Sequence, residues 1–523
     1  MQKGLINHIR IQANLLKVHF LIAGMLLAGL VNPIWARSIR LITFSDIKPA
    51  GETLHWFWHG IGMDHNQRIY VAIGNGKERE GGLGDVLIFE YDTRSGKRRF
   101  LKSVRQILKK EGNLGPNRYW PKEEGVAKVH SDIFKYNGKM YFSTHDHHSF
   151  KHIEKHRGGH FISYDPATEE FADLSKSDPQ GVSVVHEGII AINVLPQEHK
   201  LVGWTFPLGH VLLFDLMTGK TTRYDRGLRE PQKSNVARVV IATKRGSVFA
   251  AYSSRNSPKY LFKLDRQLGR LIPTTNSFRR GFFEGLAMTS DGNTAYLADL
   301  DGELYSLDVN SEKLEALGSI LPSKNVAPGE RVRLLENLTL SRDERKLFTI
   351  PHRMTQGKGA YHLYEYDIES GDKNDLGDLS SVLKGSTLTG NGVMDEKGFM
   401  YISFYNASGG IKDSQRSGIV QVDVRDRVKP TANPPVFKPY GGLFSGSVEV
   451  SLTTSTADST IHYTTNGNDP TLTSAVYTKP LHITKSTFIK ARAFTSGLIR
   501  SSAASATFII DLALPTGYVS SLE

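Results

Sequence analysis

Side chains that could carry out acid–base chemistry recur at one position of a pattern that repeats along this chain. Each repeat opens with a short strand-like run. When the apolar residues of these runs are aligned, the residue at the start is polar or charged in all seven repeats. These residues are His59, His130, His186, Arg238, Glu284, Glu336 and Asn391. Charged groups are costly in a packed core unless they are solvated or paired. We therefore expect this ring of side chains to line a water-filled opening.

A second group of such residues follows the second strand-like run of each repeat. Its densest segment is Thr144–His148, which contains three histidines. Successive antiparallel strands bring the start of the first strand and the end of the second to the same edge of a sheet. Both groups should therefore share one mouth of the fold. The second group also includes Trp204, Tyr252, Arg255, Asp299, His352, Arg353, Tyr405 and Asn406.

Arg, His and Tyr together are the residue types that β-elimination from a uronic acid needs. An arginine pairs with the C5 carboxylate through two parallel hydrogen bonds. A histidine, whose pKa lies near neutrality, removes the C5 proton, and a tyrosine or second histidine protonates the leaving oxygen. The candidate catalytic residues are His130, His145, Tyr252 and Arg238, and the candidate substrate-binding residues are Arg255, Arg353, Trp204, His352, Tyr405 and Asn391.

The same residues leave other chemistries open. His59, His130 and His186, from three neighbouring repeats, could bind a divalent metal such as Zn²⁺, Mn²⁺ or Ca²⁺; no short metal-binding motif supports this, and His145 with His147 is an alternative source of ligands. Glu284 and Glu336 could form the paired carboxylates of a glycoside hydrolase. A third alternative is a propeller that binds glycans or proteins without catalysis, because a fold alone does not decide a function.

The elements that must position these residues are short strands. Seven strand-like runs end in an aspartate that opens a turn, and several of these turns end in glycine, as in Asp92–Gly96. A repeat of this length built of short strands is typical of a β-propeller with one repeat per blade. The seven aspartates are Asp92, Asp165, Asp215, Asp265, Asp308, Asp367 and Asp423.

We therefore predict an all-β chain whose main domain, residues 37–428, is a seven-bladed β-propeller. The seventh repeat lacks an outer strand, and Ser38–Phe44 is the segment that can supply it and close the ring. One short helix is predicted around Val104–Lys110. Six or eight blades remain alternatives.

A different module follows the proline-rich linker 429–435. Residues 447–452 alternate as a half-buried strand does, and Ile461–Thr471, Phe488–Phe494 and Thr507–Ile510 follow. In these segments residues 436–512 resemble the small Ig-like β-sandwich at the C-terminus of chitobiases and β-hexosaminidases. The resemblance implies an accessory or glycan-contacting role and no hydrolysis. We expect Thr464, Gly467, Asp469 and Pro470 to serve turns and packing. Residues 513–523 form a tail.

The main domain resembles the propeller-fold uronate lyases, such as the ulvan and oligogalacturonate lyases, in architecture and in residue types. That resemblance implies His, Tyr and Arg acting at the propeller mouth. No family motif aligns through the propeller, so no catalytic residue is transferred from the family to this chain.

The N-terminus predicts export. Three basic residues precede the apolar run Val18–Val31, and Ala36 is a plausible cleavage position, so residues 1–36 are interpreted as a signal peptide. An uncleaved anchor is the alternative, although the run is short for a membrane span. The chain has no cysteine, which favours a bacterial protein. We expect a periplasmic or extracellular protein with no stable transmembrane anchor after cleavage.

The net charge restricts the partners. The chain carries +12, and residues 1–36 contribute three positive charges and no acid, so the remainder carries +9. A basic exported protein favours anionic partners, above all an acidic polysaccharide, while nucleic acid is not expected in this compartment. Neither a phosphate-binding glycine loop ending in Gly-Lys-Ser/Thr nor a Gly-x-Ser-x-Gly nucleophile elbow is present.

Overall fold

The structure is a computed structural model that describes residues 38–511 and 519–520 with several gaps. The gaps are residues 56, 78–82, 146–155, 226–236, 252–259, 279–282, 300–301, 322–330, 334–336, 356–357, 384 and 407–416, and for 331–333, 352–355, 358–360, 406 and 519–520 only the backbone is described. The predicted signal peptide lies outside the described residues.

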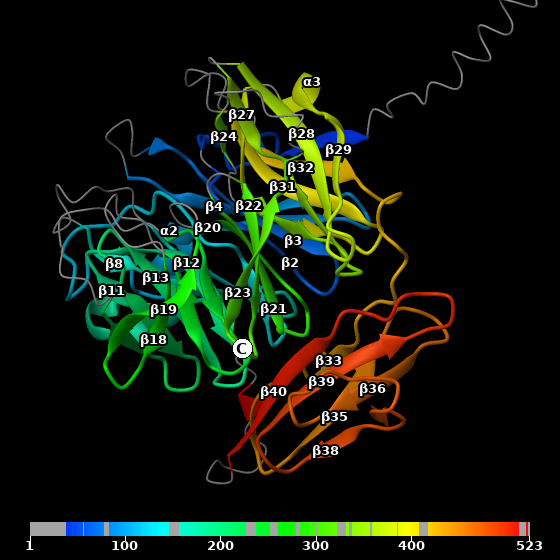
Figure 1. Cartoon of the computed structure of the whole chain (residues 1–523). Coiled ribbons are helices and arrows are strands. Elements are labelled where there is room, and N and C mark those ends of the chain that lie inside the picture. Colours follow the sequence, from blue (N-terminus) through cyan, green and yellow to red (C-terminus); the bar gives the residue numbers. More distant parts are fainter. Residues whose placement is uncertain are drawn as a thin grey trace, which may run out of the picture. The chain divides into compact units, whose positions relative to one another are not determined.

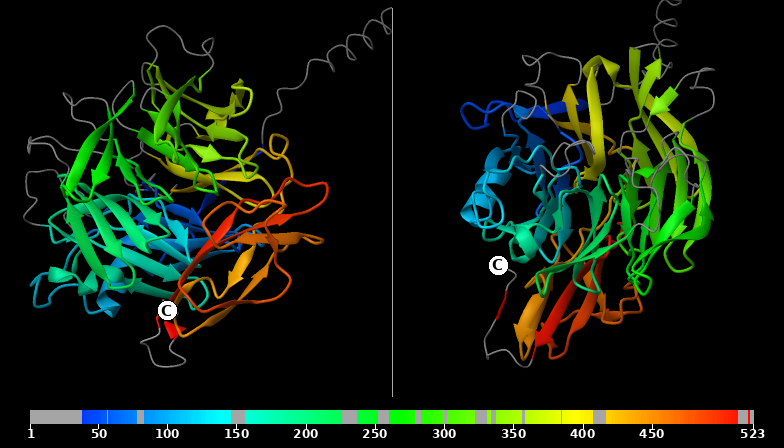
Figure 2. Two further views of the ribbon diagram at one scale, coloured as in Figure 1. Left: turned by 60° about the horizontal axis from the view of Figure 1, so that its bottom comes forward. Right: turned by 90° about the vertical axis from the view of Figure 1, so that its left-hand side faces the viewer.

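The main domain is a seven-bladed β-propeller, as the repeats predict. In the described part of the chain, each blade has a four-stranded antiparallel core. The strands run in chain order in the first six blades, and the N-terminal strand completes the seventh (Figures 1 and 2). Blade one is β2 (Ile61–Met63), β3 (Arg68–Gly74), β4 (Val86–Asp92) and β5 (Arg98–Ser103). Blade two is β6 (Phe134–Tyr136), β7 (Lys139–Ser143), β9 (Phe161–Asp165) and β10 (Glu170–Asp173). Blade three is β12 (Gly188–Leu195), β13 (Lys200–Phe206), β14 (Val211–Asp215) and β15 (Lys220–Tyr224). Blade four is β16 (Val240–Ala242), β17 (Val248–Ala250), β18 (Tyr260–Asp265) and β19 (Arg270–Ser277).

The remaining blades follow the same order, and the sixth carries an extension. Blade five is β20 (Phe283–Met288), β21 (Thr294–Asp299), β22 (Glu303–Asp308) and β23 (Lys313–Ser319), and blade six is β25 (Thr339–Leu340), β26 (Lys346–Thr349), β28 (Lys358–Asp367) and β29 (Lys373–Asp378). The long β28 also pairs with β27 (His352–Thr355), which pairs with β24 (Arg331–Arg333). Blade seven is β30 (Ser386–Met394), β31 (Phe399–Asn406), β32 (Gly418–Asp423) and β1 (Ile39–Thr43).

The predicted closure of the ring is confirmed. Strand β1 pairs antiparallel with β32, from Ile39 opposite Val422 to Thr43 opposite Gly418. Ile42 and Phe44 pack in a cluster with residues of β3, β4 and β31, so blade one lies against blade seven (Figure 1). The N-terminal strand thereby covers the edge that β32 would otherwise leave unpaired.

The repeat aspartates act through local hydrogen bonds. Asp92 ends β4, and its Oδ1 accepts from the backbone N–H groups of Arg94 and Ser95, at 2.8 and 3.1 Å. The aspartates at the ends of β14, β18, β22 and β28 accept from the residues two and three positions on in the same way. An aspartate offers the turn an acceptor that replaces a lost strand partner, which explains why this residue recurs once per blade.

The predicted helix is confirmed as α2 (Val104–Lys110), between blades one and two. A capping box at its start joins Ser103 and Gln106, and Val104, Ile107 and Leu108 are buried against both blades. Short elements complete the propeller: β8 (Gly158–Gly159), η3 (Leu174–Ser177), η4 (Pro179–Gly181), β11 (Val184–Val185) and α3 (Ser380–Leu383).

The C-terminal module is a β-sandwich, as the resemblance implies. A three-stranded sheet holds β33 (Val436–Lys438), β35 (Val448–Thr453) and β38 (Leu481–Ile483), and a second sheet holds β34 (Gly442–Ser445), β36 (Thr460–Thr464), β37 (Ala475–Val476), β39 (Thr487–Phe494), β40 (Ala504–Asp511) and β41 (Val519–Ser520). Apolar residues of both sheets form its core. Asp469 holds Lys490 and Arg492 at 3.0 and 2.9 Å, which supports the packing role predicted for it. Among the described residues no helix has the length and apolar character needed to cross a membrane.

Candidate functional site at the propeller axis

The first strands of blades one and three each follow a histidine with a left-handed backbone. His59 precedes β2 by two residues, and its φ of 54° is left-handed. His186 holds the equivalent position before β12, with a φ of 65°. Histidine occupies this backbone region more readily than most residues, and strained backbone often accompanies functional sites.

Three side chains from three blades form a polar chain at the axis. Nδ1 of His59 donates to Oδ1 of Asp132 at 3.1 Å, and Nδ2 of Asn391 donates to the other carboxylate oxygen at 2.6 Å. The amide oxygen of Asn391 accepts from the backbone N–H of Leu286 in blade five, at 3.0 Å. Asn391 lies at an irregular point in the pairing of β30 with β31. These bonds hold the imidazole of His59, which is 2% exposed, in a fixed orientation.

His130 and Arg238 meet although 108 residues separate them in the sequence. Nη1 of Arg238 donates to the imidazole of His130, 3.1 Å from its Nδ1. Burial lowers the pKa of His130 well below its ordinary value, and the nearby cation of Arg238 lowers it further, as do His59 and His145. His130 is therefore a neutral imidazole at neutral pH, in contact with a guanidinium that is partly accessible.

Two more residues complete the cluster around His130. His145 and Lys128 form an isolated antiparallel bridge, with both backbone N–H···O bonds at 2.9 Å. The rings of His145 and His130 lie edge to face, 5.7 Å apart, and the indole of Trp58 stacks on His130 at the same separation. Nζ of Lys128 lies 4.7 Å from the centre of the Trp58 ring. The cluster therefore combines two cations, three imidazoles and one indole.

Close packing from blade three fixes His145. A Cβ added to Gly188 would lie 2.2 Å from Cδ2 of His145, so only a glycine lets β12 approach this ring. His145 also contacts Phe206 edge to face, at 5.5 Å between ring centres. The position of this imidazole is thus set by two strands of the neighbouring blade.

The structure brings together three of the four candidate catalytic residues, His130, His145 and Arg238. The fourth, Tyr252, and the candidate binding residue Arg255 lie outside the described residues. Arg353 and His352 lie on β27, in the extension of blade six, where only the backbone is described.

Of the other three candidate binding residues, Trp204 needs correction. Trp204 is fully buried in the core between blades three and four, with an exposed fraction of 0%, because its position on β13 points into the packing of the sheets. Tyr405 is 4% exposed and packs against Trp58. Asn391 uses its amide to join blades two, five and seven. Tyr405 and Asn391 thus lie beside the His130 cluster, and their role in binding stays a prediction.

The metal hypothesis and the hydrolase hypothesis gain no support from the geometry. His59 and His130 stack with ring centres 5.6 Å apart, but Nδ1 of His186 donates to the carbonyl of His156 at 2.6 Å. Within the described ranges no group of three His, Cys, Asp or Glu side chains is arranged to hold a metal ion. Glu284 is 1% exposed on β20, and Glu336 lies outside the described residues.

Three residues of the cluster were missed by the sequence reasoning: Trp58, Lys128 and Asp132. Lys128, His130 and Asp132 alternate along the chain, and extended residues two apart share a side. This alternation could have identified Lys128 and Asp132 from the sequence. Trp58 carried no signal, because its stacking on His130 depends on the meeting of two blades.

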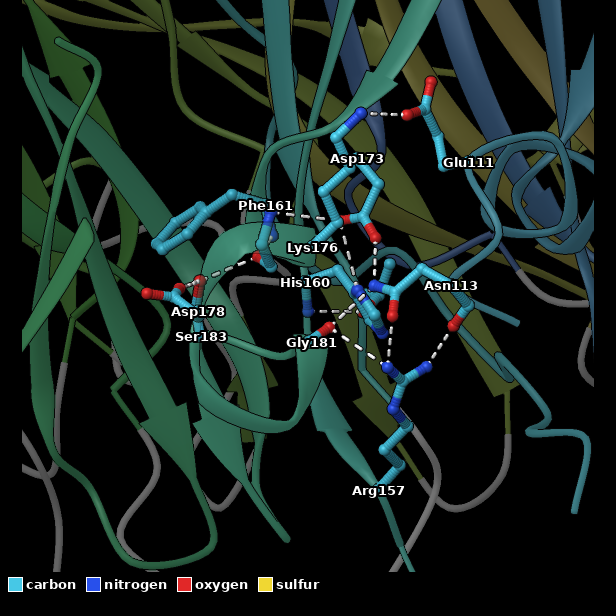
Figure 3. A network of polar contacts seen from close by, with 12 residues as sticks. Glu111, Asn113, Arg157, His160, Phe161, Asp173, Lys176, Asp178, Gly181 and Ser183 are labelled. Carbon is cyan, nitrogen blue, oxygen red and sulfur yellow. Dashed lines mark hydrogen bonds and ion pairs between the residues drawn. The ribbon is translucent and has the colours of Figure 1, made fainter. Parts of the chain in front are cut away.

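A second buried network, which includes Arg157, His160 and Asp173, reaches the residue before His145 (Figure 3). His160 exchanges hydrogen bonds with Thr144, the residue before His145, at 2.9 and 3.0 Å. Its imidazole lies 3.2 Å from Asp173 and 3.4 Å from Glu124. Arg157 pairs with Glu124 at 2.8 Å, and all four charged side chains are at most 7% exposed. The network positions the strand that leads to His145.

The His160 network predicts a stability that depends on pH. Burial opposes protonation of His160, but Asp173 and Glu124 outweigh it and raise its pKa from 6.5 to about 9. The folded state therefore binds more protons than the unfolded state between these values, so this contribution is complete below pH 6.5 and is lost as the pH rises through about 9. Urea unfolding at several pH values should show the free energy of unfolding falling across this range. His160→Gln should flatten the fall, and an equal slope in that variant would contradict the assignment.

The comparisons with known proteins bear on the two domains separately. Residues 439–506 match the family model of the chitobiase/β-hexosaminidase C-terminal domain. A search of the curated proteins finds no significant match. Among solved structures, the β-propeller domain of Cps50 (Swd1) from Myceliophteria thermophila is similar, with 11% identity and a TM-score of 0.41 over 72% of this chain and 98% of that one. The propeller fold of this chain follows from its own seven sheets and their closure.

Proposed function

We propose that the protein β-eliminates an acidic glycan at the propeller mouth that holds His130 and Arg238. The chain joins a β-propeller to a C-terminal domain of a carbohydrate-related family, which supports a propeller that binds or acts on glycans. The observation that carries the finer proposal is the contact between a neutral buried imidazole and a guanidinium, with Lys128 close by. These are the groups that a uronate elimination requires.

The role of Arg238 is to bind the substrate carboxylate. A guanidinium pairs with a carboxylate through two hydrogen bonds, and pairing neutralises the negative charge that otherwise opposes removal of the C5 proton. Lys128 adds a second positive charge beside the site, and the net charge of the chain outside residues 1–36, +9, favours approach of a polyanion.

The role of His130 is to remove the C5 proton. Its low pKa keeps it unprotonated at neutral pH. As Arg238 turns to the substrate carboxylate, the charge of the guanidinium beside His130 is offset, so the basicity of His130 increases. The C5–H electron pair forms the C4–C5 double bond, and the C4–O bond breaks with its electrons going to oxygen. An acid, for which His145 and Tyr252 are the candidates, protonates that oxygen.

We propose export to the periplasm or the cell exterior, where such polysaccharides occur, through cleavage after Ala36. Binding without catalysis is the alternative use of the same cluster, since its cations and aromatic ring would also hold an acidic sugar.

Replacing Arg238 by methionine tests the proposed function. The variant keeps the length of the side chain and removes the group that neutralises the carboxylate, so we expect the rate of elimination from polygalacturonate or ulvan to fall by about 10²–10³-fold. Activity is followed as the ultraviolet absorbance of the unsaturated uronate. Arg223→Met is the matched control, because Arg223 is an exposed residue of β15. Equal activity in the two variants would contradict the role of Arg238.

A further inference from the structure

A cavity lies towards the end of the propeller axis opposite the histidine cluster. A space of about 340 Å³ runs from Asp132 and Asn391 along the first strands of the blades. It continues into a chamber of about 780 Å³, since Met63, Lys135 and Val393 line both spaces. These residues lie at the far ends of the first strands, whereas His59 and His130 lie at their beginnings.

The chamber lies between the propeller and the C-terminal module. Residues 39–523 form one compact unit, and hydrogen bonds and a ring contact join the two domains. The N–H of Ala503 donates to Ser290 Oγ at 2.9 Å, and Lys490 Nζ donates to the carbonyl of Asp291 at 2.7 Å. Tyr440 packs on His65, with ring centres 4.4 Å apart. The chamber is therefore walled by turns of the propeller on one side and by strands of the sandwich on the other.

Two of the cations that line the chamber have no carboxylate partner among the described residues. The side chain of Lys135 is exposed to the cavity, and no described residue forms a hydrogen bond or ion pair with its Nζ. Arg342 donates from Nη2 to the amide of Asn433 at 2.9 Å, while its Nη1 is buried without a described partner.

The acids of the chamber are already engaged. Glu396 forms two hydrogen bonds of 2.9 Å with Arg94, and Asp64 accepts from Arg68 and from the hydroxyl of Tyr70 at 2.8 and 3.0 Å. Desolvation lowers the pKa of Lys135, against the attraction of Asp64, and Arg342 lowers it further. Desolvation also lowers the pKa of His65 to about 4, so this ring is neutral. The chamber thus holds excess positive charge.

We propose that this chamber is a second binding site, for a small anion that carries a carboxylate or sulfate group between Lys135 and Arg342. A volume of about 780 Å³ is within the usual range for small-molecule sites. It leaves room for a sugar acid as well as for inorganic sulfate. An anion there would pair with both cations and join the propeller to the sandwich. The site does not depend on elimination chemistry at the other mouth.

Calorimetric titration of the full chain with sodium sulfate and, separately, with galacturonate tests the site, with chloride at equal ionic strength as the blank. We expect saturable binding that weakens at least about tenfold in Lys135→Met and in Arg342→Gln, because each loses a charge-assisted hydrogen bond. The exposed Lys97→Met should bind as the wild type does. Preference for galacturonate over sulfate would identify a sugar acid, and equal binding would identify a general anion site.

Thermal unfolding separates a binding role from a structural one. Removing one of two like charges held close together should leave the melting temperature of Lys135→Met unchanged or raise it in anion-free buffer, and should abolish the rise that the anion produces. A lower melting temperature combined with an undiminished response to anion would overturn the proposal. So would the absence of saturable binding of both probes to the wild type. Arg238→Met removes the carboxylate-binding group of the proposed lyase mouth, so saturable binding that persists in this variant and is lost in Lys135→Met belongs to the chamber. Binding that is lost in Arg238→Met and retained in Lys135→Met would overturn the proposal.

Discussion

His130→Gln should lose about 10²–10⁴-fold of its elimination rate, the usual contribution of a positioned general base. Glutamine keeps a polar group beside Arg238 but cannot accept a proton at neutral pH. The loss should appear in kcat with little change in KM, because the carboxylate would still bind Arg238. Initial rates on an acidic polysaccharide, followed through the absorbance of the unsaturated product, give both parameters.

The control for this variant is His482→Gln, since His482 is exposed on the C-terminal sandwich and pairs only with Glu449 among the described residues. We expect it to retain full activity. If His130→Gln kept its kcat, or if both variants lost activity equally, His130 would not be the base. The cluster would then have to act through His145 or through a residue outside the described ranges.

Arg157→Met should lower the free energy of unfolding by about 3–5 kcal/mol, the typical effect of removing one partner from a buried ion pair. Arg157 is 3% exposed and donates to Glu124 and to the backbone carbonyl of Gln180, the latter at 3.0 Å. Without it, Glu124 and Asp173 share only His160 as a cation. Chemical denaturation measures the change.

The double variant Arg157→Met/Glu124→Gln distinguishes a charge effect from lost packing. Once the carboxylate is also neutral, no uncompensated charge is buried, so the double variant should be more stable than Arg157→Met alone. A double variant less stable than both single variants would mean that packing, and not charge, sets the cost. Since the network leads to His145 through Thr144, Arg157→Met should also reduce the activity of the folded fraction.

The propeller could be predicted because its evidence is local and repeated. Asp92 and its six equivalents each form a turn with the two or three residues that follow. Such a turn can therefore be recognised from a few consecutive residues of the sequence. Strand β1 could be predicted to close the ring because the seventh repeat has no outer strand of its own. The helix Val104–Lys110 was readable from its own residues.

The site could be predicted only in part, because its geometry depends on contacts between blades. Alignment of the repeats placed His59, His130 and Arg238 near the axis. It could not show that Asn391 would turn its amide to Asp132, because that depends on an irregularity in β30. Trp204 was misplaced because alternation in a strand buried on both faces does not reveal which side chains reach the mouth.

The chamber between the propeller and the C-terminal module could not be predicted from the sequence. Lys135 and Arg342 lie 207 positions apart, and nothing in their neighbourhoods marks them as a pair. Blades two and six bring these two residues together. The C-terminal module, which begins more than ninety residues after Arg342, forms the other wall of the chamber.

The central claim is that the pair formed by His130 and Arg238 performs elimination on a uronate. Incubation of the wild-type protein with polygalacturonate and ulvan, with the ultraviolet absorbance of the unsaturated uronate and new reducing ends recorded together, tests it most directly. The account predicts that both signals rise in equal molar amounts, because each elimination creates one unsaturated residue and one reducing end. Reducing ends without absorbance would indicate hydrolysis. Tight binding of both polysaccharides with neither signal would contradict catalysis at this mouth.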